Sequence, residues 1–266
     1  MGRKIKDKYR EKLERELTSV EKRDRMLIKD RDTDREVMEE VFDKRTLMIL
    51  YDLINDGVIS EIVGVIKAGK ESRLYWGKDS EEKDIAIKIY LTTSAEFRRG
   101  MLPYIEGDPR FRRIRRDMHH LVYAWAQKEF KNLKIAYEAG VRVPKPIAVK
   151  GNVLVMEFIG EDGVSAPLLK EAELEDAEGT FKVLLDYVKK LYRSGLVHSD
   201  LSEYNVMIWD GEPVLIDLSQ SVLLEHPRSG EYLLRDITNL VKFFRKWGLS
   251  LPEPEVIYRE IVGSVE

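Results

Sequence analysis

The sequence predicts an α+β fold of two lobes, in which a small β-rich lobe precedes a helical lobe. Three short strands follow a first helix, and a long helix and two further strands come next. The remainder has mainly helical periodicity, with one short β-rich stretch at Val206–Ile216. This order is typical of a β-rich lobe joined to a helical lobe. The expected strands lie near Val58–Lys67, Arg73–Gly77, Asp84–Tyr90, Ile147–Val149 and Val153–Phe158.

The composition agrees with a folded chain of this kind. Its 266 residues suit one large domain, or two small lobes with an extension. A hydrophobic fraction of 43% is enough for a core and argues against global disorder. Charged residues make up 35% of the chain, but the net charge is only −3, so overall charge does not indicate a nucleic-acid partner.

Cysteine and long apolar runs are both absent from the sequence. Without cysteine, disulfides and thiolate metal sites are excluded. No apolar run reaches the roughly 18 residues that a membrane helix needs, and the N-terminus is charged rather than signal-like. We therefore expect a cytoplasmic protein that has no membrane partner.

Three segments are expected along the chain. Residues 1–57 are expected to form a charged helical extension, residues 58–157 the β-rich N-lobe, and residues 158–266 the helical C-lobe. Within the extension, a helix is expected over Val37–Ile54, and Asn55-Asp56-Gly57 should end it. The charged part before that helix is either a solvated helix or a helix that docks on a partner.

A polar stretch from Leu91 to Asp117 is expected to be a mobile loop. It holds two glycines, two prolines and many charges, with few apolar anchors. A long helix should follow and end at Gly140. If the protein phosphorylates itself, the expected acceptors are the aliphatic hydroxyls of this stretch, which belong to Thr92, Thr93 and Ser94.

The strongest chemical signal is the run VHSDLSEYN at 197–205, which is followed by VLID at 214–217. Phosphoryl transfer needs a carboxylate that orients the nucleophile, and here Asp200 is the candidate catalytic residue. It also needs oxygen ligands that hold Mg²⁺ on the phosphates, for which Asn205 and Asp217 are the candidates. Protein kinases carry this constellation with an arginine at the place of Ser199. His198 is interpreted as a brace of the loop rather than a general base.

The second signal is a lysine in an otherwise apolar strand. Alternation in the run DIAIKIY at 84–90 places Lys88 on the face opposite the isoleucines, where a buried ammonium needs an anion. In the next helix, Glu129 lies inside an apolar stripe made by Val122, Ala126, Leu133 and Ala136. A Lys88–Glu129 ion pair satisfies both charges and matches the lysine–glutamate pair of kinases.

Two weaker signals complete a nucleotide site. The turn between the first two strands could cover phosphates with its amides and with its side chains, at Gly69, Lys70, Glu71 and Ser72. The strand at 153–158 and its exit could form a hinge between the lobes. There, backbone groups of Glu157 and Ile159 would bind adenine and Met156 would line the pocket.

Together these segments resemble the Rio family of atypical serine/threonine protein kinases, and its first subfamily in particular. The resemblance covers roughly residues 45–247 and rests on GKES at 69–72, EGDPRFR at 106–112, WAQKE at 125–129, MEFIG at 156–160, HSDLSEYN at 198–205 and IDLSQ at 216–220. It implies a bilobal protein-kinase-like fold with a reduced C-lobe that lacks an activation segment. One departure is Ala68, where the family often has threonine.

The resemblance also implies an activity. Family members use ATP with Mg²⁺, or alternatively Mn²⁺, as serine kinases or ATPases in maturation of the small ribosomal subunit. The implied partners are precursor particles of that subunit, with their rRNA and proteins. The family's residue roles carry over to Lys88, Glu129, Asp200, Asn205 and Asp217, and the last of these is also an acceptor for an aspartyl phosphate.

Two other functions remain open from the residues. A small-molecule phosphotransferase of the aminoglycoside or choline kinase type shares the Asp…Asn…Asp order. An assembly factor could instead use ATP only as a conformational switch while it binds RNA or protein. For that reading, arginines of the polar stretch would contact rRNA phosphates rather than solvent: Arg98, Arg99, Arg110, Arg112, Arg113, Arg115 and Arg116.

Overall fold

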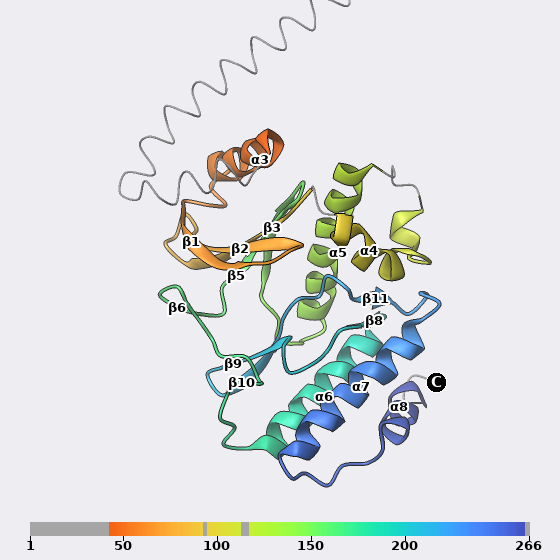
Figure 1. Ribbon diagram of the computed structural model, residues 1–266. Coiled ribbons are helices and arrows are strands. Elements are labelled where there is room, and N and C mark those ends of the chain that lie inside the picture. Colours follow the sequence, from red (N-terminus) through yellow and green to blue (C-terminus); the bar gives the residue numbers. More distant parts are fainter. Residues whose placement is uncertain (1–42, 93–94, 113–116, 264–266) are drawn as a thin grey trace, which may run out of the picture.

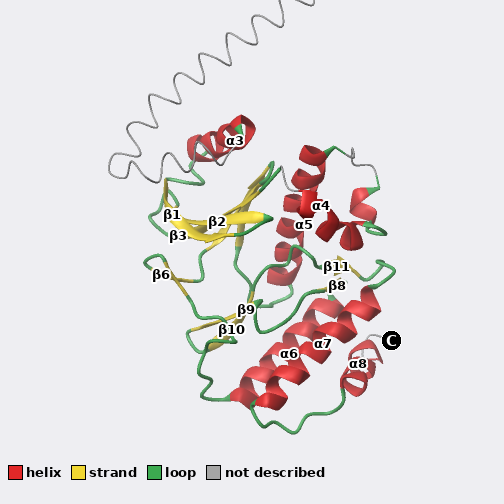
Figure 2. Ribbon diagram, in the orientation of Figure 1, coloured by secondary structure: helices red, strands yellow, loops and turns green. Residues whose placement is uncertain are grey.

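The computed structural model describes residues 43–92, 95–112 and 117–263. An antiparallel five-stranded sheet lies at one end and a mainly helical part at the other (Figures 1 and 2). The strand order is β1-β2-β3-β5-β4, which makes β3 the central strand. The strands are β1 (Glu61–Ala68), β2 (Ser72–Lys78), β3 (Asp84–Tyr90), β4 (Pro146–Lys150) and β5 (Val153–Glu157), as predicted to within a few residues.

The two faces of β3 have different neighbours. Ile85, Ile87 and Ile89 belong to an apolar cluster that also contains Leu50 and Leu53. These leucines come from helix α3 (Lys44–Asn55), whose N-cap is Asp43 and which ends at Asp56 and a left-handed Gly57. The predicted end of this helix is confirmed, whereas the first residues of the expected helix lie outside the described part.

Helix α5 (Met118–Glu138) covers the opposite face of the sheet. Val122, Trp125 and Ala126 on α5 cluster with Tyr90 from β3. The predicted apolar stripe of this helix is confirmed, since its members are buried. Residues near the C-terminal end of α5 instead join the core of the helical part, so one helix packs against both parts of the molecule.

The stretch 91–117, expected to be a loop, is partly helical. It contains helix α4 (Ala95–Ile105) and a 3₁₀ turn η1 (Pro109–Phe111). Met101 and Phe111 anchor these elements, because both are buried against Trp125 and its neighbours. The sequence did not predict this helix because it contains Gly100 and Pro103, and both residue types are unfavourable within helices.

The helical part is built on two long helices that lie side by side, with a third beside them (Figure 1). These are α6 (Ala177–Arg193), α7 (Ser229–Lys246) and α8 (Pro254–Gly263). The apolar set predicted for α7 is buried in the common core: Leu233, Ile237, Leu240, Val241 and Phe244. Among the helices of the described ranges, none has the length and apolar character needed to cross a bilayer.

Three small antiparallel pairs complete the C-terminal part, one before α6 and two between α6 and α7. They are β6 (Gly160–Glu161) with β7 (Val164–Ser165), β8 (Leu196–Val197) with β11 (Val222–Leu223), and β9 (Val206–Trp209) with β10 (Glu212–Leu215). Only the β9–β10 hairpin was predicted, because two-residue strands are too short to show alternation. The β8–β9 and β10–β11 connections carry the candidate catalytic and metal-binding residues.

Candidate active site

The loop between β8 and β9 presents Asp200 and Asn205 together. Asn205 Nδ2 donates to the carbonyl oxygen of Asp200 at 2.8 Å and to its Oδ2 at 2.9 Å. The pKa of Asp200 is raised, first by burial and then by the negative charge of Asp217. Asp200 therefore has the environment of a proton acceptor, and its rotamer is fixed by a neighbouring amide.

Asp217 follows β10 and faces the central strand of the sheet. Its Oδ1 lies 2.9 Å from Lys88 Nζ, and its backbone has a φ of 58°, in the left-handed region. Desolvation acts to raise the pKa of Asp217, but the Lys88 charge holds that pKa well below its usual value. The side chain is still 46% exposed, so this carboxylate is ionised and accessible.

Lys88 forms a second ion pair, with Glu129 of α5. The Nζ–Oε1 distance is 2.9 Å, and the glutamate side chain is 1% exposed. This confirms the pairing predicted from the strand alternation and the helix stripe. Burial acts to lower the pKa of Lys88, but Asp217 and Glu129 together hold that pKa well above its usual value. The hydroxyl of Tyr90 donates to the other oxygen of Glu129, which fixes the carboxylate from both sides.

Helix α7 holds the catalytic loop through its polar side chains. The buried carboxylate of Asp236 accepts the backbone N–H of Ser199 at 2.7 Å and that of Leu201 at 2.9 Å. Arg235 donates to the carbonyl of Ser199, and Asn239 Nδ2 donates to that of Leu201 at 3.0 Å. The backbone on both sides of Asp200 is therefore fixed by one helix.

His198 lies behind this loop. Its Nε2 is 3.3 Å from the carbonyl oxygen of Ile216, and the ring is buried. Burial lowers the pKa of His198 to about 4, so the imidazole is neutral at physiological pH. A buried, neutral histidine that bridges the catalytic loop to the residue before Asp217 has the geometry of a brace.

The comparisons with known proteins agree with this geometry. The RIO domain family matches residues 73–257 of the chain. The chain belongs to the RIO family. A Haloferax volcanii relative named RIO-type serine/threonine-protein kinase Rio1 is 44% identical over 240 residues, covering 90% of this chain and 82% of the relative. A Methanocaldococcus jannaschii relative of the same name is 40% identical over 232 residues, covering 87% and 79%.

Longer RIO kinases and solved structures are also similar. The chain spans half the length of a Caenorhabditis elegans serine/threonine-protein kinase RIO1, at 41% identity over 95% of this chain. The fold matches the crystal structure of the Rio2 kinase–ADP/Mg²⁺–phosphoaspartate complex from Chaetomium thermophilum. That match has a TM-score of 0.59 at 23% identity and covers 80% of this chain and 65% of that one. The protein-kinase-like fold expected from the sequence is thus confirmed.

The RIO chain has ligands that fit a magnesium ion bound together with phosphates. Asn205 Nδ2 donates to Asp200, Asn205 Oδ1 accepts no bond from the described residues, and Asp217 is ionised and accessible. Within the described residues there is no cluster of three His, Cys, Asp or Glu side chains that would form an all-protein cage. Two protein oxygens agree with the preference of Mg²⁺ for few protein ligands plus phosphates and water.

The turn at 69–72 connects β1 and β2 at the end of the sheet. Gly69 N–H donates to Ser72 O at 3.0 Å, and Ser72 pairs with Tyr90, two residues beyond Lys88. The pKa of Glu71 is raised by burial and then by the charge of Asp217, so this carboxylate lies within the field of the site. The structure therefore brings Gly69, Lys70, Glu71 and Ser72 to the strand end from which Lys88 projects.

Some groups of the predicted hinge are bound within the protein. The N–H of Glu157 donates to Lys145 O at 2.9 Å, and the carbonyl of Ile159 accepts from Ala166 N–H at 2.9 Å. The Glu157 side chain is bound to Arg142 at 2.7 Å. The N–H of Ile159, in contrast, has no acceptor among the described residues. Met156 lies on β5 opposite Ala86 and is half-buried.

Two predictions for the stretch 91–117 need correction or lie outside the described residues. Arg110 is not a solvated or RNA-facing side chain, because it pairs with buried Asp108 at 2.6 Å. The hydroxyl of Thr92 donates to Asp43 at 2.7 Å, so it is engaged in the cap of α3. Thr93 and Ser94 lie outside the described part, as do the arginines at 113, 115 and 116.

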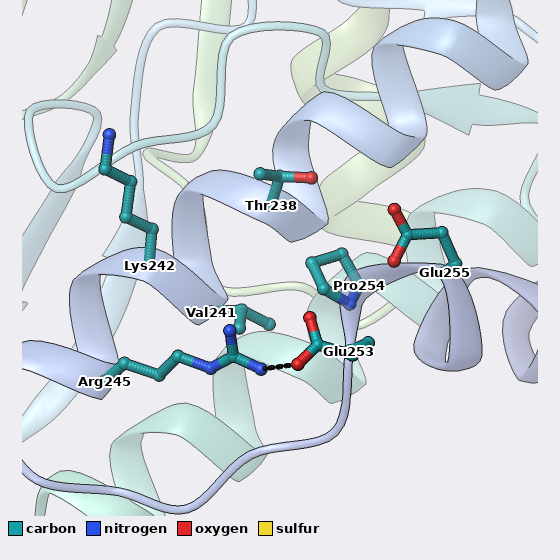
Figure 3. Close-up of a pocket in the computed structure, with 7 residues that line it drawn as sticks. All are labelled: Thr238, Val241, Lys242, Arg245, Glu253, Pro254 and Glu255. Carbon is teal, nitrogen blue, oxygen red and sulfur yellow. Dashed lines mark hydrogen bonds and ion pairs between the residues drawn. The ribbon is translucent and has the colours of Figure 1, made fainter.

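A surface pocket of about 360 Å³ lies elsewhere, between α7 and α8 (Figure 3). Arg245 and Glu253 form an ion pair of 2.8 Å in it, drawn as a dashed line in the figure. The pocket shares no residue with the catalytic loop, and it is lined by Thr238, Val241, Lys242, Arg245, Glu253, Pro254 and Glu255. It plays no part in the chemistry described above.

Proposed function

We propose that this RIO chain is an ATP–Mg²⁺-dependent serine kinase and ATPase that acts on precursors of the small ribosomal subunit. The observation that carries the chemistry is Lys88, whose Nζ lies 2.9 Å from both Glu129 and Asp217. In protein kinases, nucleotide phosphates are bound by a lysine that is paired with a helix glutamate and lies beside another carboxylate that is accessible. In this proposal ATP lies between an N-lobe at 58–157 and a C-lobe at 158–266.

Each site residue has its own role in this proposal. Lys88 binds the α- and β-phosphates, and Glu129 keeps its ammonium in place. Asn205 Oδ1 and the Asp217 carboxylate hold Mg²⁺, which neutralises charge on the phosphates when bound. The N–H of Ile159 donates to adenine, and the 69–72 turn covers the phosphates.

Asp200 accepts the proton of the attacking hydroxyl. For a serine acceptor, the oxygen bonds to the γ-phosphorus, the bond to the β–γ bridging oxygen breaks, and ADP leaves. With water as the acceptor, the same displacement releases inorganic phosphate. The raised pKa of Asp200, caused by burial and by Asp217, moves this base toward the pH at which it works.

Asp217 offers a second route through a covalent intermediate. The Rio2 kinase from Chaetomium thermophilum forms a complex with ADP, Mg²⁺ and phosphoaspartate. We infer that the Asp217 carboxylate can attack the γ-phosphorus and expel ADP, after which water hydrolyses the acyl phosphate. Desolvation acts to raise the pKa of Asp217, but Lys88 keeps that pKa low, so this nucleophile stays ionised.

The test follows the label from γ-labelled ATP in the presence of Mg²⁺ and small-subunit precursors. Acid-stable label on serine would support the kinase, free phosphate the ATPase, and acid-labile label that is lost in Asp217→Asn the aspartyl route. Label found only on a small-molecule acceptor would instead identify a small-molecule phosphotransferase. Binding of ATP with no transfer to any acceptor would support a protein that uses ATP only as a conformational switch.

A further inference from the structure

The segment that follows Asp217 is held by side chains of helix α5. Lys128 Nζ donates to Ser219 O at 2.6 Å. Asn132 Nδ2 donates to Leu218 O at 2.8 Å and to Ser221 O at 3.1 Å. Lys128 and Asn132 are 1% and 0% exposed, so these bonds are protected from water. Three backbone carbonyls directly after the candidate metal ligand are thus bound from one helix.

The orientation of the Asn132 amide is set by Arg110. Arg110 Nη1 donates to Asn132 Oδ1 at 2.7 Å, and the same guanidinium is paired with Asp108 at 2.6 Å. Because a guanidinium only donates hydrogen bonds, it binds the amide oxygen and leaves the NH₂ group facing the two carbonyls. Asp108 is itself buried and caps the 3₁₀ turn η1, so the whole arrangement is rigid.

Asp217 needs such support. Its φ of 58° places a non-glycine residue in the left-handed region, a strained conformation that persists only where the surroundings enforce it. Helix α5 also carries Glu129, the partner of Lys88. Consequently, one helix fixes both sides of the Lys88–Asp217 contact, the lysine through Glu129 and the aspartate through the segment after it.

We propose that Lys128 and Asn132, with Asn132 oriented by the Arg110–Asp108 pair, are positioning residues that hold Asp217 in its metal-binding conformation. None of them reaches the reacting atoms, and each acts through the backbone at 218–221. The proposal rests on the proposed role of Asp217 as a magnesium ligand. It gives the run at 106–112 a function, because Asp108 and Arg110 belong to it. The alternative is that these bonds only stabilise the fold.

Two variants separate positioning from stability. Asn132→Asp keeps the shape and the oxygen that binds Arg110, but it turns an oxygen toward the carbonyls of Leu218 and Ser221. Lys128→Met removes the donor to Ser219 and keeps an apolar stem against Trp125, whose ring centroid lies 4.5 Å from Nζ. Matched controls on exposed positions of the same helix are Gln127→Glu and Lys131→Met.

Two measurements are made on the full chain. Hydrogen exchange without nucleotide or metal reports the conformation of residues 217–222 directly. Calorimetry of ATP binding, with and without Mg²⁺, gives the gain in affinity due to the metal. For both test variants we expect exchange at 218–221 to become at least tenfold faster and the metal-dependent gain to fall at least tenfold. We also expect metal-free ATP affinity to stay within about twofold, and both controls to match wild type.

The outcomes are distinguishable. Variants that unfold at lower temperature but keep wild-type exchange at 218–221 would overturn the positioning role. If Asn132→Asp fails to fold, Lys128→Met decides alone, since its donor binds Ser219 independently of Asn132. If wild-type ATP affinity does not depend on Mg²⁺, the proposed role of Asp217 fails, and unchanged exchange in Lys128→Met would then refute the positioning role separately.

Discussion

The carboxylate of Asp236 accepts the backbone N–H of Ser199 at 2.7 Å, on the N-terminal side of the candidate catalytic aspartate. Its other oxygen accepts the N–H of Leu201 at 2.9 Å, on the C-terminal side. Ser199 has a φ of 68°, so the loop turns through the left-handed region immediately before Asp200. One buried carboxylate therefore maintains a strained turn that aims the Asp200 side chain.

Replacing Asp236 by asparagine should loosen this turn. The amide keeps one acceptor oxygen but directs an NH₂ group at a backbone N–H, which leaves a buried donor unpaired. We expect a loss of about 1–3 kcal/mol in unfolding free energy, measured by urea titration above pH 7, where Asp236 is ionised. Turnover should fall more than ATP affinity. Asp186→Asn, at an exposed position of α6, should change stability by less than about 0.5 kcal/mol. Equal stability of the two variants would contradict the role of Asp236.

His198 should make stability increase with pH below neutrality. Burial lowers the pKa of His198 from 6.5 to about 4, so the unfolded chain binds a proton in this interval that the folded chain does not. The stabilisation is fully present above pH 6.5 and is lost as the pH falls toward 4. It amounts to about 3 kcal/mol at 1.36 kcal/mol per pKa unit. Unfolding free energies across this range should show a weaker pH dependence in His198→Gln. An unchanged dependence would contradict the prediction.

Asp236 supplies a control of opposite sign in the same titration. Burial raises the pKa of Asp236 to about 7, despite the two backbone N–H groups that donate hydrogen bonds to it. The folded chain therefore retains a proton that the unfolded chain releases above pH 3.8, and stability from this group falls as the pH rises toward 7. Removing this group should make the remaining dependence of stability on pH more positive, whereas removing His198 should make it less positive.

The part of the site that was predictable from sequence depends on local periodicity. Alternation along β3 assigned Lys88 to one face, and the stripe of α5 assigned Glu129 to the face that meets it. Both assignments hold because strand and helix periods fix side-chain direction. The same signal was present for Asp236, which lies among the buried residues Leu233, Ile237 and Leu240 of α7. A charged residue inside an apolar stripe indicated a buried partner there too, and sequence reasoning missed it.

Other features had no local signal. Lys128 and Asn132 bind backbone carbonyls 86 to 91 positions further along the chain. Every residue has a backbone carbonyl, so neither composition nor spacing could indicate which carbonyls these side chains bind. Helix α4 was hidden by Gly100 and Pro103, whose low helix propensity is outweighed by the packing of Met101. Tertiary contacts decided these features, and only the folded chain shows them.

The hydroxyl of Tyr90 should contribute to ATP binding without touching ATP. It donates to Glu129, whose other oxygen holds Lys88. Tyr90→Phe removes this donor and leaves a buried carboxylate oxygen unsatisfied, so Glu129 positions Lys88 less well. We expect ATP affinity to fall about three- to tenfold, measured by calorimetry with Mg²⁺. Tyr137→Phe, at an exposed position of α5, is the control. Unchanged affinity in Tyr90→Phe would show that Lys88 alone is sufficient.

Asp200→Asn should separate nucleotide binding from transfer. Asparagine keeps the size of the side chain, and Asn205 Nδ2 still donates to the carbonyl of residue 200. The proton acceptor is lost, so we expect phosphoryl transfer to fall by about 10²–10⁴-fold at nearly constant ATP affinity. Single-turnover assays measure this, with Asp210→Asn in the exposed β9–β10 turn as the control. Turnover equal to that of wild type would remove Asp200 from the mechanism.

The chain should phosphorylate free peptides poorly, because the segment after Asp217 provides no platform for them. Ordinary protein kinases use that segment to position an extended peptide. Here Val222 and Leu223 return at once to pair with β8, the strand before the catalytic loop, and helix α7 begins at Ser229.

Several residues of this short connection are buried. Leu218, Ser221 and Val222 have no exposed surface, and His226 is 2% exposed. Without a surface to align the acceptor, the positioning that dominates catalysis of phosphoryl transfer is lost for a free peptide, although ATP can still bind. An acceptor held by a large particle, or water, does not need such a surface. We therefore expect slow ATP hydrolysis and slow labelling of peptide arrays, with turnover raised by small-subunit precursors. Labelling of short peptides at about 1–100 per second, as ordinary protein kinases achieve, would show that a peptide platform exists elsewhere on the molecule.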